Sequence, residues 1–159
     1  MRFLADGMLG NITRWLRLLG HDVEYEPARD DRALLNRSRI EGRVLITADI
    51  ELFRLAKRRG LEAVLVKETS TAEALSRLSK KLKIQMDFNE LESRCPTCGS
   101  PIRRVAKSSV KERVPEGTYK RYMRFWTCTN PACSKIYWRG SHWKKIQKTI
   151  AEARRRGDA

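Results

Sequence analysis

Long hydrophobic runs are absent from this chain of 159 residues, and cysteine and histidine are scarce. Because no run of about 18 apolar residues occurs, we expect no transmembrane helix and no membrane partner. The N-terminus lacks the long apolar stretch of a signal peptide, so we expect a cytoplasmic protein in which disulfides are disfavoured. Hydrophobic residues still make up 41% of the chain, which is enough for a core and argues against global disorder.

Acidic residues are scarce in only one part of the sequence. Residues 1–93 carry 17 basic and 15 acidic side chains, a net charge of +2. Residues 94–159 carry 17 basic and 4 acidic side chains, a net charge of +13. Such a one-sided field attracts polyanions through counterion release, so the C-terminal part is expected to bind nucleic acid. A solvated basic face without a partner is the simpler alternative.

Residues 1–85 alternate between short apolar segments and amphipathic segments. We expect strands at 2–5, 21–26, 44–46 and 63–66, and helices over about 10–20, 30–42, 49–60 and 69–82. This alternation favours the α/β class, with a mainly parallel sheet covered by helices on both faces. Right-handed crossovers then bring the C-terminal ends of the strands to one edge, where α/β sheets keep their sites.

The pattern changes after residue 85. Residues 86–94 are typical of a connector, and from Cys95 onward short β-like pieces and turn residues replace the alternation. We therefore expect two units, residues 1–90 and residues 91–159. Ser141 is expected to cap a final helix that carries Trp143, Ile146 and Ile150 on one face.

All four cysteines lie in the basic part. Cys95 and Cys98 form a Cys-Pro-Thr-Cys-Gly knuckle, and Cys128 and Cys133 form a second pair with four residues between them. Both spacings are typical of zinc ligands, and Gly99 tolerates the backbone twist after the second ligand. A thioredoxin-like active site would not explain the second pair. We expect a structural Zn²⁺ that holds a segment too small to bury its own core.

Acidic side chains follow the predicted strands. Asp6 follows the first strand and Asp49 the third, while Asp30 and Asp31 follow the second strand and begin a helix. Converging carboxylates repel one another unless a cation lies between them, so a catalytic Mg²⁺ or Mn²⁺ is expected here. Each acid also has a simpler interpretation, because aspartates are good residues for the start of a helix.

Several blocks together resemble one known family. They are DGMLGNITRWLRLLG at 6–20, Asp31 with its following leucines, GRVLITAD at 42–49, the two cysteine pairs, and YWRGSHW at 137–143. This set is similar to the Mut-seven C-terminal RNase domain family, over about residues 1–150. The resemblance implies a PIN-like three-layer fold with a small C-terminal zinc ribbon. Ala48 and the wide second cysteine pair depart from the usual pattern of that family.

The resemblance also implies a metal-dependent ribonuclease whose acids are Asp6, Asp31 and Asp49, the expected ligands of the Mg²⁺ or Mn²⁺. PIN-like sites usually have a fourth acidic or polar residue, and Glu51 is the candidate here. Asp30 competes with Asp31 for its role. The wider set of predicted RNA contacts consists of basic and aromatic side chains: Arg14, Arg17, Arg103, Arg104, Lys107, Lys120, Arg121, Arg124, Tyr137, Trp138, Arg139, His142 and Trp143.

The sequence leaves three functions open. The first is an endoribonuclease whose zinc ribbon holds the RNA. The second is a non-catalytic protein on the same fold that binds RNA, with ribosomal RNA or the ribosome as a candidate partner. The third is the toxin of a toxin–antitoxin pair.

Overall fold

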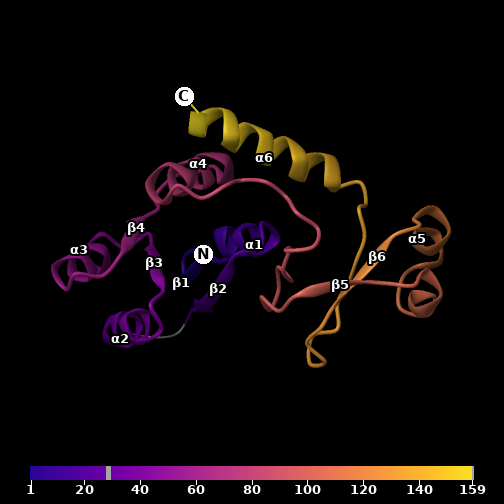
Figure 1. Ribbon diagram of the computed structural model, residues 1–159, viewed down its shortest axis with the longest axis horizontal. Coiled ribbons are helices and arrows are strands. Elements are labelled where there is room, and N and C mark those ends of the chain that lie inside the picture. Colours follow the sequence, from indigo (N-terminus) through magenta and orange to yellow (C-terminus); the bar gives the residue numbers. More distant parts are fainter. Residues whose placement is uncertain (28–29, 159) are drawn as a thin grey trace.

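A computed structural model describes residues 1–27 and 30–158 of the chain. Its elements in chain order are β1 (Arg2–Asp6), α1 (Gly10–Leu18), β2 (Asp22–Glu26), α2 (Asp31–Glu41), β3 (Val44–Thr47), α3 (Ile50–Arg58), β4 (Ala63–Leu65), α4 (Thr71–Leu82), β5 (Ile102–Val105), a 3-10 helix η1 (Lys107–Val110), α5 (Glu116–Arg121), β6 (Phe125–Cys128), β7 (Ile136–Tyr137) and α6 (Trp143–Asp158). Figure 1 shows the parallel sheet with its helices on one side of the molecule and the β5–β6 region on the other.

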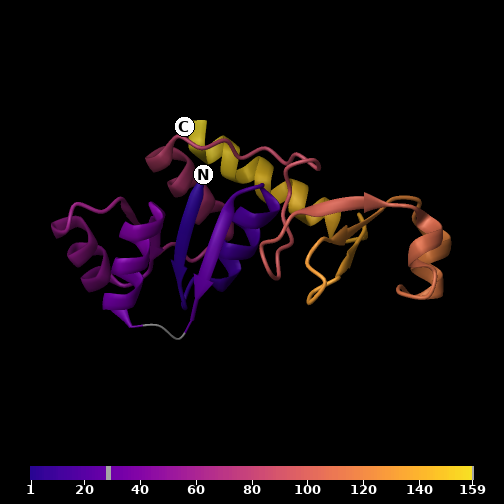
Figure 2. The same ribbon diagram turned by 60° about the horizontal axis from the view of Figure 1, so that its bottom comes forward.

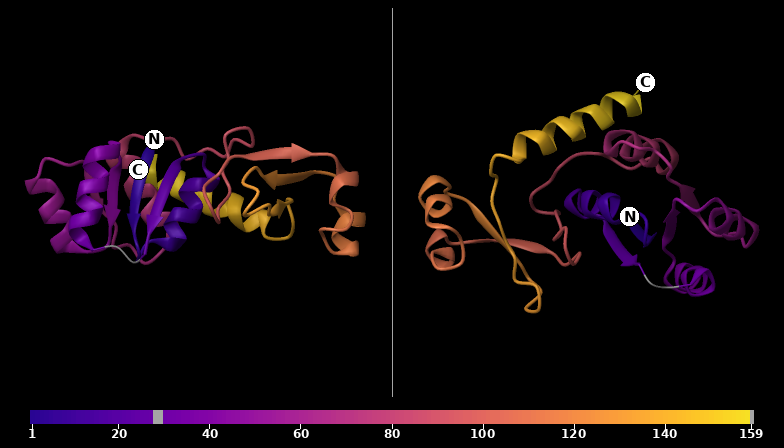
Figure 3. Two further views of the ribbon diagram at one scale, coloured as in Figure 1. Left: turned by 90° about the horizontal axis from the view of Figure 1, so that it is seen from below. Right: turned by 180° about the vertical axis from the view of Figure 1, so that it is seen from behind.

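The first sheet is parallel and has the strand order β2-β1-β3-β4. Side chains alternate between its two faces, as the two-residue period of a strand requires. Phe3 and Ile46 pack with residues of α1, α4 and α6, whereas Leu4 and Leu45 pack with residues of α2 and α3. The two apolar cores therefore lie on opposite faces of one sheet, with helices over both (Figure 3). This arrangement confirms the predicted α/β fold class.

Three helices begin at side-chain caps that the sequence contains. Asp30, Asp49 and Ser70 each accept a backbone N–H of the following helix, which satisfies donors that the first turn leaves free. Gly42 ends α2 with a φ of 61°, a conformation that suits glycine. Asp30 and Asp49 thus mark the starts of α2 and α3, the helices that follow β2 and β3. The candidate acids Asp31 and Asp49 lie at these two helix starts.

The second sheet is antiparallel, with the order β5-β6-β7. Together with the four clustered cysteines it is compatible with the predicted zinc ribbon. Between β5 and β6 the chain forms an arm of η1 and α5, which lies far from the parallel sheet in Figure 2. The sequence showed no clean period here, and α5 buries none of its residues.

The last helix returns to the first sheet. α6 lies along α4 (Figure 1), and its Ile150 and Ala153 belong to the same core as Leu75 and Leu78. The expected boundary near residue 91 thus separates the two sheets, but α6 crosses back over it. No helix in the described part of the chain has the length and apolarity needed to cross a membrane.

Candidate functional site

Two neighbouring strands bring Asp6 and Asp49 to the same edge of the parallel sheet. Asp6 is the last residue of β1 and Asp49 caps α3 directly after β3, which pairs with β1. The buried Thr47 connects them: its hydroxyl donates to a carboxylate oxygen of Asp6 and accepts the backbone N–H of Asp49 at 3.0 Å. Thr47 was not predicted as a site residue, because the predicted strand ended at residue 46, whereas β3 includes Thr47.

The two carboxylates also accept backbone donors. Asp6 accepts the N–H of Met8 at 3.0 Å, and Asp49 accepts the N–H of Glu51 at 2.8 Å and of Leu52 at 3.2 Å. These bonds hold each side chain in one orientation without neutralising its charge. The acids are therefore fixed in place before any ligand binds.

Asp31 begins α2, and its side chain is exposed. Desolvation, followed by the charges of Asp49, Asp30 and Asp6, raises the pKa of Asp31. The charges of acids on two other elements therefore reach Asp31. Asp30 has a structural task instead, because its side chain caps α2 through the N–H of Ala33 at 2.8 Å.

Glu51 has a different environment. Its exposed side chain forms an ion pair with Arg54 of the same helix at 3.0 Å. It does not contribute to the pKa shift of Asp31. Glu51 was predicted as the fourth acid of the site. In the structure, its carboxylate instead contacts Arg54, one turn further along α3.

The acidic edge has the chemistry of a hard-cation site. Oxygen ligands from carboxylates and a neighbouring hydroxyl suit Mg²⁺ or Mn²⁺, and a divalent ion would relieve the repulsion at Asp31. Among the described residues, the four cysteines form the group that could hold a metal ion, with ligand atoms within 4.8 Å of one another, and Asp6, Asp31 and Asp49 do not form such a group. The predicted Mg²⁺ or Mn²⁺ ligands are therefore not brought together into a ready-made metal site.

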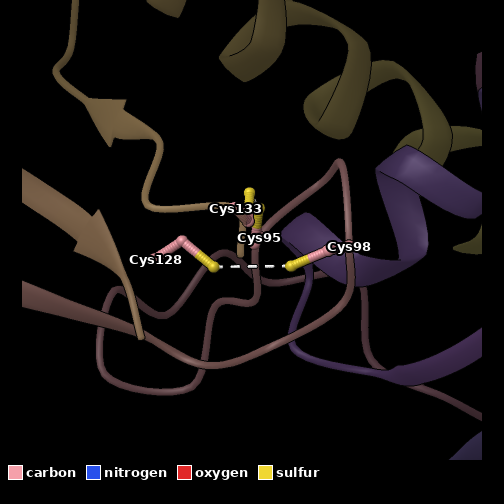
Figure 4. Close-up of side chains that lie close together, drawn as sticks. All are labelled: Cys95, Cys98, Cys128 and Cys133. Atoms are coloured by element: carbon pink, nitrogen blue, oxygen red, sulfur yellow. Dashed lines mark hydrogen bonds between the residues drawn. The ribbon is translucent and has the colours of Figure 1, made fainter. Parts of the chain in front are cut away.

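The four cysteines form a compact cluster at the other end of the connector. Figure 4 shows Cys98 and Cys128 facing each other, with Cys95 and Cys133 beside them. The sulfur–sulfur distance is 3.4 Å between Cys98 and Cys128 and 3.8 Å between Cys95 and Cys133. A tetrahedral zinc with bonds of about 2.3 Å needs sulfurs about 3.8 Å apart, so the cluster fits a structural metal such as zinc.

The thiols are electrostatically coupled. Although burial works against it, hydrogen bonds from Ser100 lower the pKa of Cys98 to about 6. Burial, with the neighbouring thiols, raises the pKa of Cys128 to about 12. One thiolate therefore forms easily while its neighbour resists, and a bound cation is what allows all four to ionise. The hydroxyl of Tyr137 lies 2.9 Å from the sulfur of Cys95 and supports the cluster from outside.

Arg17 joins the two halves of the molecule. Its guanidinium donates to the carbonyl of Val23 at 2.8 and 3.0 Å and to the carbonyl of Thr97 in the knuckle at 3.0 Å. Gly99 has a φ of +81°, and a side chain there would meet Arg17 Nε at 3.0 Å. Burial lowers the pKa of Arg17. We predicted Arg17 as an RNA contact, but the residue is buried and its donors are used inside the protein.

The other predicted basic contacts are exposed or partly exposed. Arg103 and Arg104 lie on β5, Arg124 precedes β6, and Lys107, Lys120 and Arg121 lie on the arm. Two of them lie over tyrosine rings, Lys107 over Tyr119 at 4.8 Å and Arg121 over Tyr122 at 5.7 Å. Arg14 is exposed on α1. Lys120 pairs with Glu116 at 2.6 Å. The other side chains place exposed or partly exposed cations on the ribbon, the arm and α1, where phosphates could be bound.

The aromatic candidates gather between the two halves. Arg139 pairs with Glu90 at 2.8 Å and lies over the ring of Trp143 at 4.8 Å. Trp138 packs near Phe125 in the ribbon core, and His142 is exposed beside Trp143. Sequence reasoning assigned Glu90 to a connector and missed it, because nothing in a single sequence marks a partner 49 residues away.

One protein family matches the chain. The model described as the Mut7-C RNAse domain matches residues 1–150. That range includes both the acidic edge and the cysteine cluster, and it confirms the resemblance inferred from the sequence blocks. No curated protein and no solved structure matches the chain.

Proposed function

Because the chain belongs to the Mut7-C RNAse domain family, we propose that it is a metal-dependent endoribonuclease with separate cutting and holding regions. Family membership indicates a nuclease-like role and RNA as substrate or partner. The finer assignment is that the acidic edge cleaves RNA phosphodiester bonds and that the zinc ribbon and its arm hold the RNA. The substrate would be a cytoplasmic RNA, with ribosomal RNA among the candidates.

The observation that carries this proposal is the hydrogen-bonded series Asp6–Thr47–Asp49. It links the ends of two adjacent parallel strands at the edge where α/β proteins keep their sites. The charges of Asp49 and Asp6 also contribute to the raised pKa of Asp31, after desolvation, which supports including Asp31 with the two acids.

Asp6, Asp31 and Asp49 would hold one or two Mg²⁺ or Mn²⁺ ions. Such an ion supplies an activated water and stabilises the charge that develops on the phosphate. The protein orients the carboxylates through Thr47 and through the backbone N–H groups of Met8 and Glu51. Arg14, which is exposed four residues after the start of α1, would contact a phosphate of the bound RNA.

The test is cleavage of single-stranded and structured RNA in Mn²⁺ by the wild type, Asp6→Asn and Asp49→Asn. Asparagine keeps the acceptor that Thr47 or the helix N-terminus needs, so both variants are expected to fold. Asp30→Asn is the matched control, because it keeps the cap of α2 and is expected to cleave like the wild type. Cleavage that survives in both Asp6→Asn and Asp49→Asn would exclude the acidic edge as the catalytic site.

A non-catalytic RNA- or ribosome-binding protein is the second candidate. The pairing of Glu51 with Arg54 favours it, because the expected fourth acid is already occupied by a cation. The net charge of +13 after residue 93 also supports affinity without any catalysis. RNA binding in the wild type with no cleavage in Mn²⁺ or Mg²⁺ would select this function over the first.

A further inference from the structure

A cavity lies where the two halves of the molecule meet. Its volume is about 220 Å³, and its wall includes Leu18 of α1, Phe88 and Ser93 of the connector, Trp126 of β6 and Trp143 of α6. Pockets for drug-sized ligands are usually at least about 300 Å³, so this cavity suits a single ring system. None of the acids Asp6, Asp31 and Asp49 lines it, whereas Pro96 and Tyr137 in its wall border the cysteine cluster.

Arg139 forms one wall of the cavity and is held from several sides. Its guanidinium lies 4.8 Å from the ring centroid of Trp143, 5.5 Å from that of Trp126 and 5.6 Å from that of Phe88. Glu90 fixes the same group by an ion pair of 2.8 Å. Phe88 and Trp143 in turn meet edge to face at 4.7 Å. The planar guanidinium and the aromatic rings around the cavity are therefore held in fixed positions before a ligand binds.

Ser93 gives the cavity an unused polar group. The residue is 2% exposed, and its hydroxyl has no hydrogen-bond partner among the described residues. Its backbone is pinned by a bond from its N–H to the carbonyl of Asn89 at 2.9 Å. A buried hydroxyl without a partner costs stability, and a ligand in the cavity that reaches Ser93 would supply the missing hydrogen bond.

The charges exclude two classes of ligand. A cationic ligand is disfavoured, because Arg139 already lies over the aromatic rings and would repel it. An anionic ligand gains little, because Glu90 neutralises that guanidinium. What remains is a neutral, flat group with hydrogen-bonding edges, and a nucleobase has these properties.

We propose that this cavity binds one unpaired nucleobase of the RNA, and the proposal rests on RNA being the partner of the protein. The base stacks among Arg139 and the tryptophans, and Ser93 hydrogen-bonds to its edge. The phosphates stay outside, where Lys144, Lys145 and Lys148 of α6 are exposed. The site would therefore select single-stranded over fully paired RNA.

Helix α1 runs between the acidic edge and the cavity, so its length gives the approximate distance from the bound base to the proposed cleavage site. α1 begins at Gly10, just after Asp6, and ends at Leu18 in the cavity wall. The eight steps between these residues span about 12 Å at the rise of an α-helix. A strand anchored by one base would thus pass along α1 and Arg14 to the acidic edge within a few nucleotides.

Binding of three fluorescent RNA decamers to the full chain, by anisotropy without divalent ions, tests the proposal. One decamer carries all its bases, one is abasic throughout, and one is abasic except for a single central base. The wild type is expected to bind the abasic strand at least about tenfold more weakly than the full strand. The single base is expected to restore most of that loss. Equal affinity for all three strands would overturn the proposal.

Two variants locate the effect. Ser93→Ala removes only the unpartnered hydroxyl, so its melting temperature is expected to stay the same or rise. Its affinity for the single-base decamer is expected to fall about three- to tenfold. Arg139→Lys keeps the charge beside Glu90 but loses the planar stacking surface, and a similar fall is expected. Neither variant is expected to change binding of the fully abasic strand.

Thr13→Val is the matched control. Thr13 also has a buried hydroxyl without a partner in the described residues, but it does not line the cavity. Its removal is expected to affect stability like Ser93→Ala and to leave affinity unchanged. If Ser93→Ala binds the single-base decamer as tightly as Thr13→Val does, the base site is excluded. Since no step needs cleavage, absence of nuclease activity would refute the catalytic proposal alone.

Discussion

In the parallel sheet, Leu45 and Ile46 of β3 are fully buried and separate two apolar cores, whereas β5 of the ribbon exposes Arg103 and Arg104. The acids of the first region therefore stand on a packed scaffold. The ribbon has only a few buried apolar side chains, among them Phe125 and Trp126, and its four cysteines have to supply the rest of its stability. The first region can hold like charges on a rigid support, whereas the ribbon is expected to need a bound metal in order to fold.

The largest expected effect is the loss of the ribbon without zinc. Cys95→Ser and Cys128→Ser are each expected to release the metal, since structural zinc contributes about 10–16 kcal/mol of binding free energy that is also folding free energy. Backbone amide NMR resonances of β5–β7 should collapse into the unfolded range, while those of β1–β4 stay dispersed. Metal content is measured on the same samples.

Thr97→Ser, between the first two cysteines, is the control for that experiment and should keep both the metal and the resonances. If the ribbon stays folded in the cysteine variants with no metal bound, the contrast between the two regions fails.

A smaller effect is expected for the Thr47 hydroxyl, which hydrogen-bonds to the carboxylate of Asp6 and to the backbone N–H of Asp49. Thr47→Val removes this hydroxyl. Because the buried carboxylate of Asp6 then lacks a donor, we expect the free energy of unfolding to fall by about 1–3 kcal/mol. Cleavage should fall about tenfold or more through misplacement of the acids. Urea unfolding and single-turnover cleavage measure the two quantities.

Thr47→Ser retains the hydroxyl and should recover most of both losses. A Thr47→Val protein that cleaves as well as Thr47→Ser would show that this hydrogen bond does not position the acids.

Arg17→Lys tests how the two regions are joined. A lysine cannot donate hydrogen bonds to the carbonyls of Val23 and Thr97 at the same time. We therefore expect the free energy of unfolding to fall by about 1–3 kcal/mol and the backbone amides of the ribbon to exchange faster. Hydrogen exchange resolved by residue is the measurement. Arg14→Lys on the exposed side of the same helix should change stability by less than about 0.5 kcal/mol. Equal effects of the two variants would remove Arg17 as the connecting residue.

The smallest expected effect concerns Asp31. Its raised pKa means that the folded protein binds this proton more tightly than the unfolded chain does, so metal-free stability from this group is lost as the pH rises through that pKa. Asp31→Asn should therefore raise the melting temperature of metal-free protein at pH 7 by about 1–2 °C and lower it relative to wild type when Mn²⁺ is added. No change in either condition would mean that Asp31 lies outside the acidic group.

Hydrophobic periodicity predicted the parallel sheet, and cysteine spacing predicted the cysteine cluster. Both signals lie within short stretches of the sequence. The strands at 2–5 and 44–46, for example, lie where β1 and β3 are found. Long-range pairing was not predictable in this way. A basic residue on α1 looks the same whether it meets solvent or, as Arg17 does, a carbonyl 80 residues away. The role proposed for Ser93 depends on a cavity wall built from segments far apart in the sequence, so the residues next to Ser93 in the chain do not indicate it.

The division of labour between the two regions is tested most directly by separating the rate of cleavage from the affinity for RNA. Single-turnover cleavage in Mn²⁺ is measured at increasing protein concentration, with binding measured in parallel. Asp6→Asn should lower the saturating rate at least about 100-fold and leave affinity unchanged. Substitution of Arg103, Arg104 and Lys107 by Gln should weaken binding, make its salt dependence less steep by about three, and leave the saturating rate unchanged. If either change alters the rate and the affinity together, the acids and the ribbon do not act as separate cutting and holding regions.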